Sequence, residues 1–152
     1  MDIKKLDDLI GRDIETKLPE ETREVGRFIS GFLGEGSVVA LVGLLGAGKT
    51  VLIKGIAEGL GITDIVTSPT FIIANFYLGR LPFAHIDLYR TTDSDAIESG
   101  IYEYFLEDGI TAVEWADRAP SIIPDNAIKL IIDILDEKRR LIKVSIWSND
   151  ER

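Results

Sequence analysis

The sequence predicts an α/β layer fold in which a mostly parallel central sheet carries antiparallel strands at its edges. Two observations predict this class: helical and strand patterns alternate along the chain, and several strand patterns are short runs that are apolar on both faces. A strand has that composition when helices cover both sides of a parallel sheet. With 152 residues and 45% hydrophobic composition, the chain is expected to form one domain, residues 1–152.

The first three predicted elements are a helix, a strand and a second helix. Apolar side chains at helical spacing predict a helix over residues 18–33, with Pro19 in its first turn. Residues 37–42 are β-branched and apolar on both faces, which predicts a buried strand. A second helical pattern covers residues 49–60 and ends at Gly61. The strand therefore leads through a glycine-rich turn straight into a helix.

The middle of the chain has strand patterns separated by turn signals. Residues 65–66 and 71–77 are predicted strands around a break at residues 67–70. A turn at residues 79–80 leads into a further strand over residues 81–88. Because so short a connection joins antiparallel strands, the strands on either side of this turn are expected to be antiparallel neighbours.

The last third of the chain begins with a helical pattern over residues 93–106, followed by a buried-type strand over residues 110–114. Residues 128–135 and 141–147 then flank a charged turn at residues 136–138. Apolar and polar residues alternate in the second arm, which predicts a β-hairpin.

Residues 43–50 read GLLGAGKT and match the pattern G-x-x-x-x-G-K-S/T at every fixed position. Glycine lets the backbone curl with its N–H groups inward, where they donate to phosphate oxygens, and the following helix adds its positive dipole end. Lys49 suits the β- and γ-phosphates, and the Thr50 hydroxyl is a hard oxygen ligand for Mg²⁺. A strand before the motif and a helix after it predict a P-loop NTPase-like three-layer sandwich. The residues expected to bind the nucleotide here are Leu45, Gly46, Ala47, Gly48, Lys49, Thr50 and Val51.

Two predicted strands end on a carboxylate, one on Asp87 and the other on Glu114. P-loop chemistry needs a carboxylate at the tip of a neighbouring strand to orient Mg²⁺ or its waters, and a polar group to position the attacking water. Either acid alone is equally consistent with a solvated strand end or a helix cap. The two together favour a site in which Thr50, Asp87 and Glu114 are metal ligands and Lys49, Asp87 and Glu114 are catalytic.

For other residues near these motifs, the sequence is consistent with either a functional or a structural role. Residues 67–70 fall where small NTPases have switch-like loops, with the Thr70 hydroxyl near metal or γ-phosphate, or they form a turn stiffened by Pro69. His85 is more often a packed, hydrogen-bonded residue than a catalyst at such a position. Trp115 would stack on a base or a partner, or pack in the core. Nothing in the spacing singles out a phosphate contact among the arginines Arg80, Arg90 and Arg118.

The composition excludes several other classes of protein. The chain has no cysteine and one histidine, which excludes a disulfide framework and a thiolate zinc site and leaves any metal to oxygen ligands. A net charge of −9 disfavours unaided binding of nucleic acid or anionic lipid. No apolar stretch is long enough for a membrane helix or a signal peptide, so a cytoplasmic location is expected.

Residues 45–50, 68–71, 85–90 and 114–115 form four motifs in a fixed order. They resemble those of the TsaE family (formerly YjeE), ATPases of bacterial tRNA threonylcarbamoyladenosine biosynthesis. The resemblance runs from about residue 20 to residue 124. A P-loop alone is common to many families, whereas the four motifs in this order and spacing are specific.

The resemblance implies an enzyme that uses ATP and Mg²⁺ to support a partner complex of TsaB and TsaD. That complex attaches a threonylcarbamoyl group to an adenosine beside the tRNA anticodon. By the same resemblance, Lys49 and Thr50 serve phosphate and magnesium, and Asp87 belongs to the magnesium shell. Glu114 and Trp115 belong to the nucleotide and hydrolysis region.

The resemblance also implies a mobile loop at residues 68–70, and Leu44 stands where the family's P-loop usually carries an acidic residue. Weak activity in isolation is expected, because no arginine finger is fixed by the sequence. Two other functions share the phosphate cradle. A small-molecule kinase would need an acceptor pocket and usually an arginine-bearing lid, and a nucleotide-dependent binding module would order its loop without useful turnover.

Overall fold

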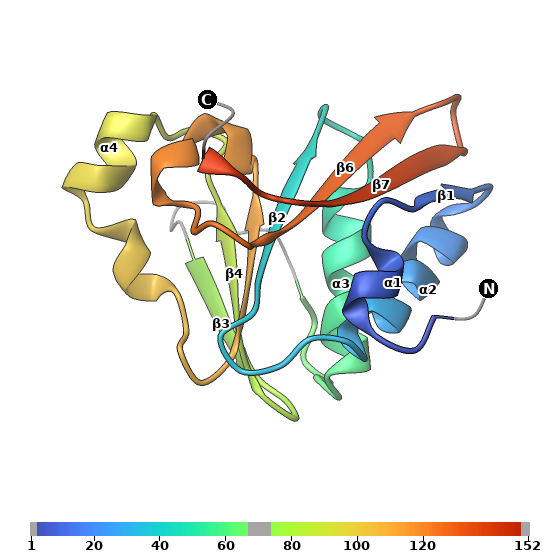
Figure 1. The fold of residues 1–152 in the computed structure, drawn as a ribbon, viewed down its shortest axis with the longest axis horizontal. Helices are drawn as coiled ribbons and strands as arrows, with labels where there is room; N and C mark the ends of the chain where they lie inside the picture. The colour runs from blue at the N-terminus through green and yellow to red at the C-terminus, as the bar shows by residue number, and fades with distance from the viewer. Residues whose placement is uncertain (1–2, 67–73, 150–152) are drawn as a thin grey trace.

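The computed structural model describes residues 3–66 and 74–149, whose strands form one seven-stranded sheet of order β1-β7-β6-β2-β5-β4-β3 (Figure 1). The four central strands, β6, β2, β5 and β4, are parallel, while β7 and β3 pair antiparallel with β6 and β4, and β1 pairs antiparallel with β7. The predicted α/β fold with antiparallel edges is confirmed. The strands are β1 (Asp13–Thr16), β2 (Val38–Gly43), β3 (Ala74–Leu78), β4 (Pro82–Asp87), β5 (Ile110–Glu114), β6 (Ile128–Ile134) and β7 (Arg140–Ile146).

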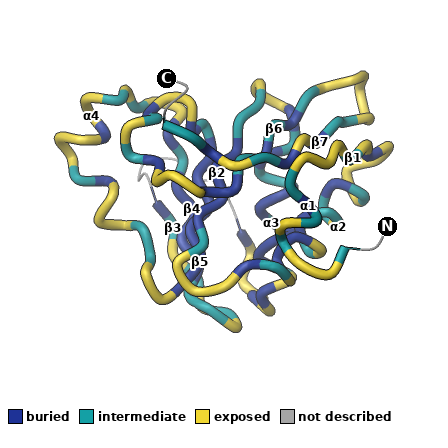
Figure 2. The backbone as a smooth tube through the Cα atoms, in the orientation of Figure 1, coloured by how far each residue is buried: buried dark blue, intermediate teal, exposed yellow. Residues whose placement is uncertain are grey.

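Helices cover both faces of the sheet and complete the predicted three layers (Figure 1). The helices α1, α2 and α3 pack on one face, and α4 with three short 3-10 helices packs on the other. The tube in Figure 2 is dark blue along the central strands and yellow in the outer loops, so the core lies on both sides of the sheet. The helices are α1 (Leu6–Leu9), α2 (Pro19–Ser30), α3 (Lys49–Gly59), α4 (Asp93–Glu98), η1 (Ile101–Tyr104), η2 (Ala116–Arg118) and η3 (Pro120–Ile122).

The central strand β2 explains why its sequence is apolar on both faces. Val39 and Leu41 pack into the core under α2 and α3, whereas Val38 and Ala40 pack into the core on the α4 side. Successive side chains of a strand point to opposite faces, so a strand covered on both sides needs no polar position. The same holds for β5, every residue of which is buried.

The helices α2 and α3 approach so closely that a side chain between them would clash. A Cβ atom built on Gly26 of α2 would lie 2.9 Å from the backbone nitrogen of Ile56 in α3. Glycine is unfavourable inside a helix, and here it permits backbone contact between neighbouring helices. This packing fixes α3, and with it the loop that precedes α3.

Two predictions of secondary structure were wrong, and one strand was missed. The helix expected over residues 93–106 is divided, because Gly100 adopts a left-handed φ of 68° between α4 and η1. Residues 65–66 are not a strand. Strand β1 was not predicted, because its sequence DIET holds one large apolar residue and pairing with β7 supplies the strand. The expected break at residues 67–70 and the start of the strand expected at residue 71 lie outside the described residues.

The remaining element predictions agree with the structure to within a few residues. The expected hairpin is β6 and β7, and the strands on either side of the turn at residues 79–80 are the antiparallel pair β3 and β4. Within residues 3–66 and 74–149, no helix is both long enough and apolar enough to span a membrane.

Candidate functional site

The carboxyl ends of β2, β4 and β5 meet at one edge of the sheet. In the strand register, Glu114 of β5 lies beside Asp87 of β4 and beside Leu41 of β2. A cavity of about 330 Å³ opens at this edge, near the lower end of the roughly 300–1,000 Å³ of small-molecule sites. In open α/β sheets, ligands bind beyond the carboxyl ends of the strands. The cavity is lined by Leu45, Gly46, Ala47, Gly48, Lys49, Thr50, Asp87, Tyr89, Glu114 and Trp115.

The loop between β2 and α3 depends on its glycines. Gly46 and Gly48 have φ angles of 81° and 100°, a region that residues with a Cβ adopt only at a cost. Gly43 is needed for space, since a Cβ there would lie 2.8 Å from the carbonyl oxygen of Ile132 in β6. The loop ends where α3 begins, so the positive end of the helix dipole faces the cavity.

Lys49, the first residue of α3, turns its ammonium back toward the loop. Its Nζ donates to the carbonyl oxygens of Gly43 at 2.6 Å and Leu44 at 2.9 Å, and lies 3.9 Å from the centre of the Trp115 ring. Burial lowers the pKa of this ammonium, and the negative charge of Glu114 opposes part of that effect. A phosphate group entering the cavity would meet a cation already held in the cavity wall.

Thr50 and His85 hold the carboxylate of Glu114 between them. The Thr50 hydroxyl donates to Oε1 of Glu114 at 3.1 Å, and Nε2 of His85 lies 2.6 Å from Oε2. His85 is fully buried, and its Nδ1 has no hydrogen-bond partner among the described residues. His85 is packed and hydrogen-bonded as expected, but the sequence did not reveal that its partner is Glu114.

Asp87 is half-buried beside this group. Its Oδ1 accepts a hydrogen bond from the backbone N–H of Tyr89 at 2.9 Å. Burial raises the pKa of the Asp87 carboxyl; the Tyr89 N–H bond opposes that rise, and the charge of Glu114 adds to it. Two carboxylates and one ammonium therefore share a small, partly dehydrated volume.

Aromatic rings form the remaining wall of the cavity. The centre of the Trp115 ring lies 4.8 Å from that of Tyr89, and the Arg118 guanidinium lies 5.2 Å from each ring centre. Trp115 has a φ of 58°, rare for a bulky residue and costly unless its surroundings hold it. Tyr89 was missed by the sequence reasoning, although it lies two residues after Asp87 in the same motif.

The other predicted site residues lie in different places. Val51 follows Thr50 in α3 and is not among the residues that line the cavity. Thr70 lies outside the described residues. Arg80 donates to the carbonyl oxygen of Ser30 at the end of α2. Of the three arginines named above, Arg118 is the one that the described contacts place against the rings of this wall.

The donor set has the chemistry that Mg²⁺ requires. The described residues contain no cluster of three His, Cys, Asp or Glu side chains arranged to hold a metal. Thr50, Glu114 and Asp87 nevertheless offer hard oxygen ligands at one edge of the cavity. Mg²⁺ commonly binds through one or two carboxylates together with water and substrate phosphates, and these residues fit that pattern.

The family model described as "Threonylcarbamoyl adenosine biosynthesis protein TsaE" matches residues 16–142. The chain belongs to the TsaE family. A Bacillus subtilis (strain 168) protein named "tRNA threonylcarbamoyladenosine biosynthesis protein TsaE" is 41% identical over 132 residues, which cover 86% of this chain and 83% of that protein. The protein of the same name from Treponema pallidum (strain Nichols) is 38% identical over 127 residues, 83% of this chain and 94% of its own.

A solved structure has the same fold as this chain. The crystal structure of Bacillus subtilis YdiB superposes with a TM-score of 0.77 at 36% sequence identity, covering 91% of this chain and 87% of that chain. The TsaE family relationship predicted from the four motifs is therefore confirmed, as is the P-loop NTPase-like fold predicted from the strand and helix that flank residues 43–50.

Proposed function

We propose that this chain binds and hydrolyses Mg–ATP at the cavity beyond β2, β4 and β5, and that this turnover supports a TsaB–TsaD complex in threonylcarbamoyladenosine modification of tRNA. One observation carries the proposal. The Thr50 hydroxyl, at the head of α3, donates to the Glu114 carboxylate at the end of β5 at 3.1 Å. This contact joins the loop 43–50 to a strand-end acid, and the similarity to proteins of tRNA threonylcarbamoyladenosine biosynthesis suggests the pathway.

The loop 43–50 would bind the polyphosphate through its backbone amides. Lys49 already donates to two loop carbonyls, at 2.6 and 2.9 Å, and a phosphate would compete for this ammonium. A charge-assisted bond to phosphate is stronger than one to a neutral carbonyl, so the exchange favours the nucleotide. Trp115 and Tyr89 would give the ligand an aromatic wall.

Thr50, Asp87 and Glu114 would hold Mg²⁺ or its waters, and the ion would neutralise charge on the phosphates. Glu114 is the candidate for orienting the attacking water, because both of its oxygens have fixed partners, Thr50 and His85. No arginine is assigned to the transferred phosphate, so we expect slow turnover in isolation and stimulation by the partner complex.

This function implies a cytoplasmic protein, since tRNA modification takes place there. The acidic surface, with a net charge of −9, is consistent with the partner complex rather than this chain holding the tRNA. Nucleotide binding needs no basic surface, because a P-loop presents its amides and one lysine locally.

The proposal is tested by phosphate release from Mg–ATP, with and without TsaB–TsaD, alongside threonylcarbamoyladenosine formation on tRNA. We expect slow release alone and faster release with the partners. Thr50→Val keeps the shape of the side chain but removes its oxygen, and it should abolish both activities, whereas the exposed control Thr63→Val should keep them. Transfer of phosphate to a small molecule would indicate a kinase, and nucleotide binding without release would indicate a binding module.

A further inference from the structure

Arg140 lies far from the motifs in sequence yet contacts the phosphate loop. It is the first residue of β7, and its Nε donates to the carbonyl oxygen of Ala47 at 3.0 Å. Its Nη2 donates to the carbonyl oxygen of Gly46 at 3.1 Å. One guanidinium thus bonds two successive carbonyls of the loop, a forked geometry that arginine provides and lysine does not.

The other side of the same guanidinium is fixed by the β6–β7 hairpin turn. Nη1 of Arg140 donates to the carbonyl oxygens of Asp136 at 2.7 Å and Arg139 at 2.9 Å. A third, longer bond reaches the carbonyl oxygen of Glu137 at 3.3 Å. The side chain is therefore immobilised before it meets the loop, and it ties the hairpin turn to residues 46–47.

Fixing these carbonyls also fixes the amides of the loop. In a trans peptide the N–H points opposite to the C=O, so a carbonyl of Ala47 held by Arg140 sets the direction of the Gly48 N–H. The carbonyl of Gly46 likewise sets the N–H of Ala47, which donates to the Leu44 carbonyl oxygen at 3.0 Å. Glycine has more conformational freedom to lose than any other residue, so a glycine-rich loop gains most from an external restraint.

We propose that Arg140 is a positioning residue for the phosphate-binding loop. Its guanidinium holds the carbonyls of Gly46 and Ala47 on the hairpin side, so that the loop is shaped before the nucleotide arrives. A preorganised site spends less binding free energy on ordering itself. This inference rests on the proposed nucleotide binding, but the loop restraint can also be measured without nucleotide.

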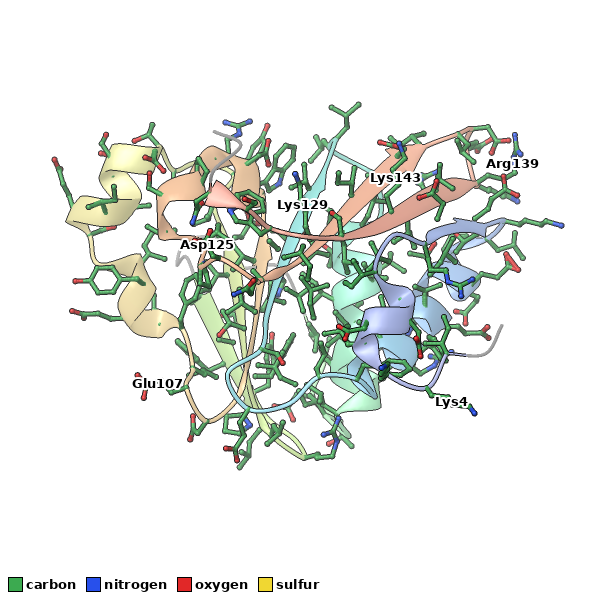
Figure 3. The ribbon with its side chains drawn as sticks, viewed as in Figure 1. Lys4, Glu107, Asp125, Lys129, Arg139 and Lys143 are labelled. Carbon is green, nitrogen blue, oxygen red and sulfur yellow. The ribbon has the colours of Figure 1, made fainter. Side chains whose placement is uncertain are left out.

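Two substitutions separate the forked hydrogen bonding of the Arg140 guanidinium from its positive charge. Arg140→Met keeps an unbranched stem and removes every donor, while Arg140→Lys keeps the positive charge but not the planar fork. The matched control is Arg139→Ala. Arg139 lies at the tip of the same hairpin (Figure 3), where its guanidinium bonds Asp136 and Glu15. The control disturbs the same turn and leaves the contact between Arg140 and the loop in place.

Calorimetric titration with Mg–ADP and with a non-hydrolysable Mg–ATP analogue gives the first readout. Arg140→Met should raise the Kd for both nucleotides roughly tenfold, as expected for losing two hydrogen bonds to a charged donor that shape the site. Arg140→Lys should also bind more weakly than wild type. In the two Arg140 variants KM should rise by a larger factor than kcat falls, whereas the control Arg139→Ala should bind nucleotide and turn it over as wild type does.

Amide hydrogen exchange of the nucleotide-free protein gives the second readout. In Arg140→Met, the amides of Ala47 and Gly48 should exchange faster than in the control, while those of the central strands stay protected. Exchange unchanged at both amides would overturn the proposal, as would wild-type affinity in Arg140→Lys or an equal loss of affinity in the control. If wild-type protein bound no nucleotide, the proposed function would fail, and the exchange result would still decide the role of Arg140.

Discussion

Two cavities lie at opposite ends of the central strands, and their lining residues show what distinguishes a functional site from a cavity without a function. The cavity at the carboxyl ends measures about 330 Å³, while the one beside the start of β2 measures about 490 Å³. The larger one has a single charged lining residue, Glu107, which points away from the protein in Figure 3. The smaller one is lined by Lys49, Asp87 and Glu114. Convergent charge at the strand ends, rather than volume, identifies the functional end.

The largest effect should come from removing the cation of the smaller cavity. Lys49→Ala should raise the nucleotide Kd at least about a hundredfold, because the charged bonds of Lys49 to the phosphates are lost. The control is Lys54→Ala, on the same helix α3 but lining a different cavity. Titration calorimetry checks both variants. If Lys49→Ala still bound nucleotide tightly, the charged residues would not distinguish the cavity at the carboxyl ends of the strands from the cavity at the opposite end.

Removing the charge of Glu114 should affect turnover more than binding. Glu114→Gln keeps the side-chain shape and loses the carboxylate, so we expect hydrolysis to fall about a hundredfold, within the range for a positioned general base. The nucleotide Kd should change by less than about threefold. Phosphate release and calorimetry on the same preparation separate the effects, and a parallel loss of both would contradict the role assigned to Glu114.

His85 should act through Glu114. His85→Leu leaves one oxygen of the buried Glu114 carboxylate without its 2.6 Å partner, and we expect turnover to fall about tenfold with nucleotide affinity unchanged. His85→Gln can still donate and should recover part of the rate. Steady-state kinetics of the two variants provide the check. Equal turnover rates in His85→Leu and His85→Gln would contradict the proposal that His85 acts through its hydrogen bond to Glu114.

A smaller effect is expected on stability, from the half-buried Asp87. Burial raises the pKa of Asp87, so the folded state favours the protonated carboxyl. The contribution of this carboxyl to the free energy of unfolding is therefore full below its unfolded-state pKa and is lost as pH rises through its folded-state pKa. Asp87→Asn should therefore raise the Tm of the nucleotide-free protein at pH 7 by roughly 2 °C, and the gain should shrink toward acid pH. Thermal unfolding across pH measures this, with exposed Asp108→Asn as control. A lower Tm in Asp87→Asn would contradict it.

The smallest effect should come from the larger cavity. Tyr102, in η1, lines it with its ring exposed, and Tyr102→Ser should change neither the nucleotide Kd nor the turnover rate by more than about twofold. The same calorimetric and phosphate-release measurements apply. A clear loss of nucleotide affinity in this variant would mean that the two cavities are coupled.

The sequence predicted those parts of the fold that local patterns encode. The strands β2 and β5 were visible as runs apolar on both faces, and the β6–β7 hairpin as alternation around a charged turn. Strand β1 was not visible, because its pairing with β7 rather than its own residues makes it a strand. The division of the helix at Gly100 depends on one left-handed residue that the helical spacing does not reveal.

The sequence predicted those residues of the candidate site that belong to a recognisable motif. The loop 43–50 and the acids Asp87 and Glu114 were named from sequence, and the structure brings them to one cavity. The bond between His85 and Glu114 and the contact of Arg140 with Ala47 span 29 and 93 residues. Such contacts follow from the order of strands in the sheet, which no local pattern contains.

The most direct test is a crystal structure with Mg²⁺ and a non-hydrolysable ATP analogue. We expect the polyphosphate inside loop 43–50, the Lys49 ammonium moved from the Leu44 carbonyl onto phosphate, and Mg²⁺ on the Thr50 hydroxyl. If Lys49 kept its bonds to the Gly43 and Leu44 carbonyls while the nucleotide lay elsewhere or was not bound, the account of this end of the sheet would be wrong.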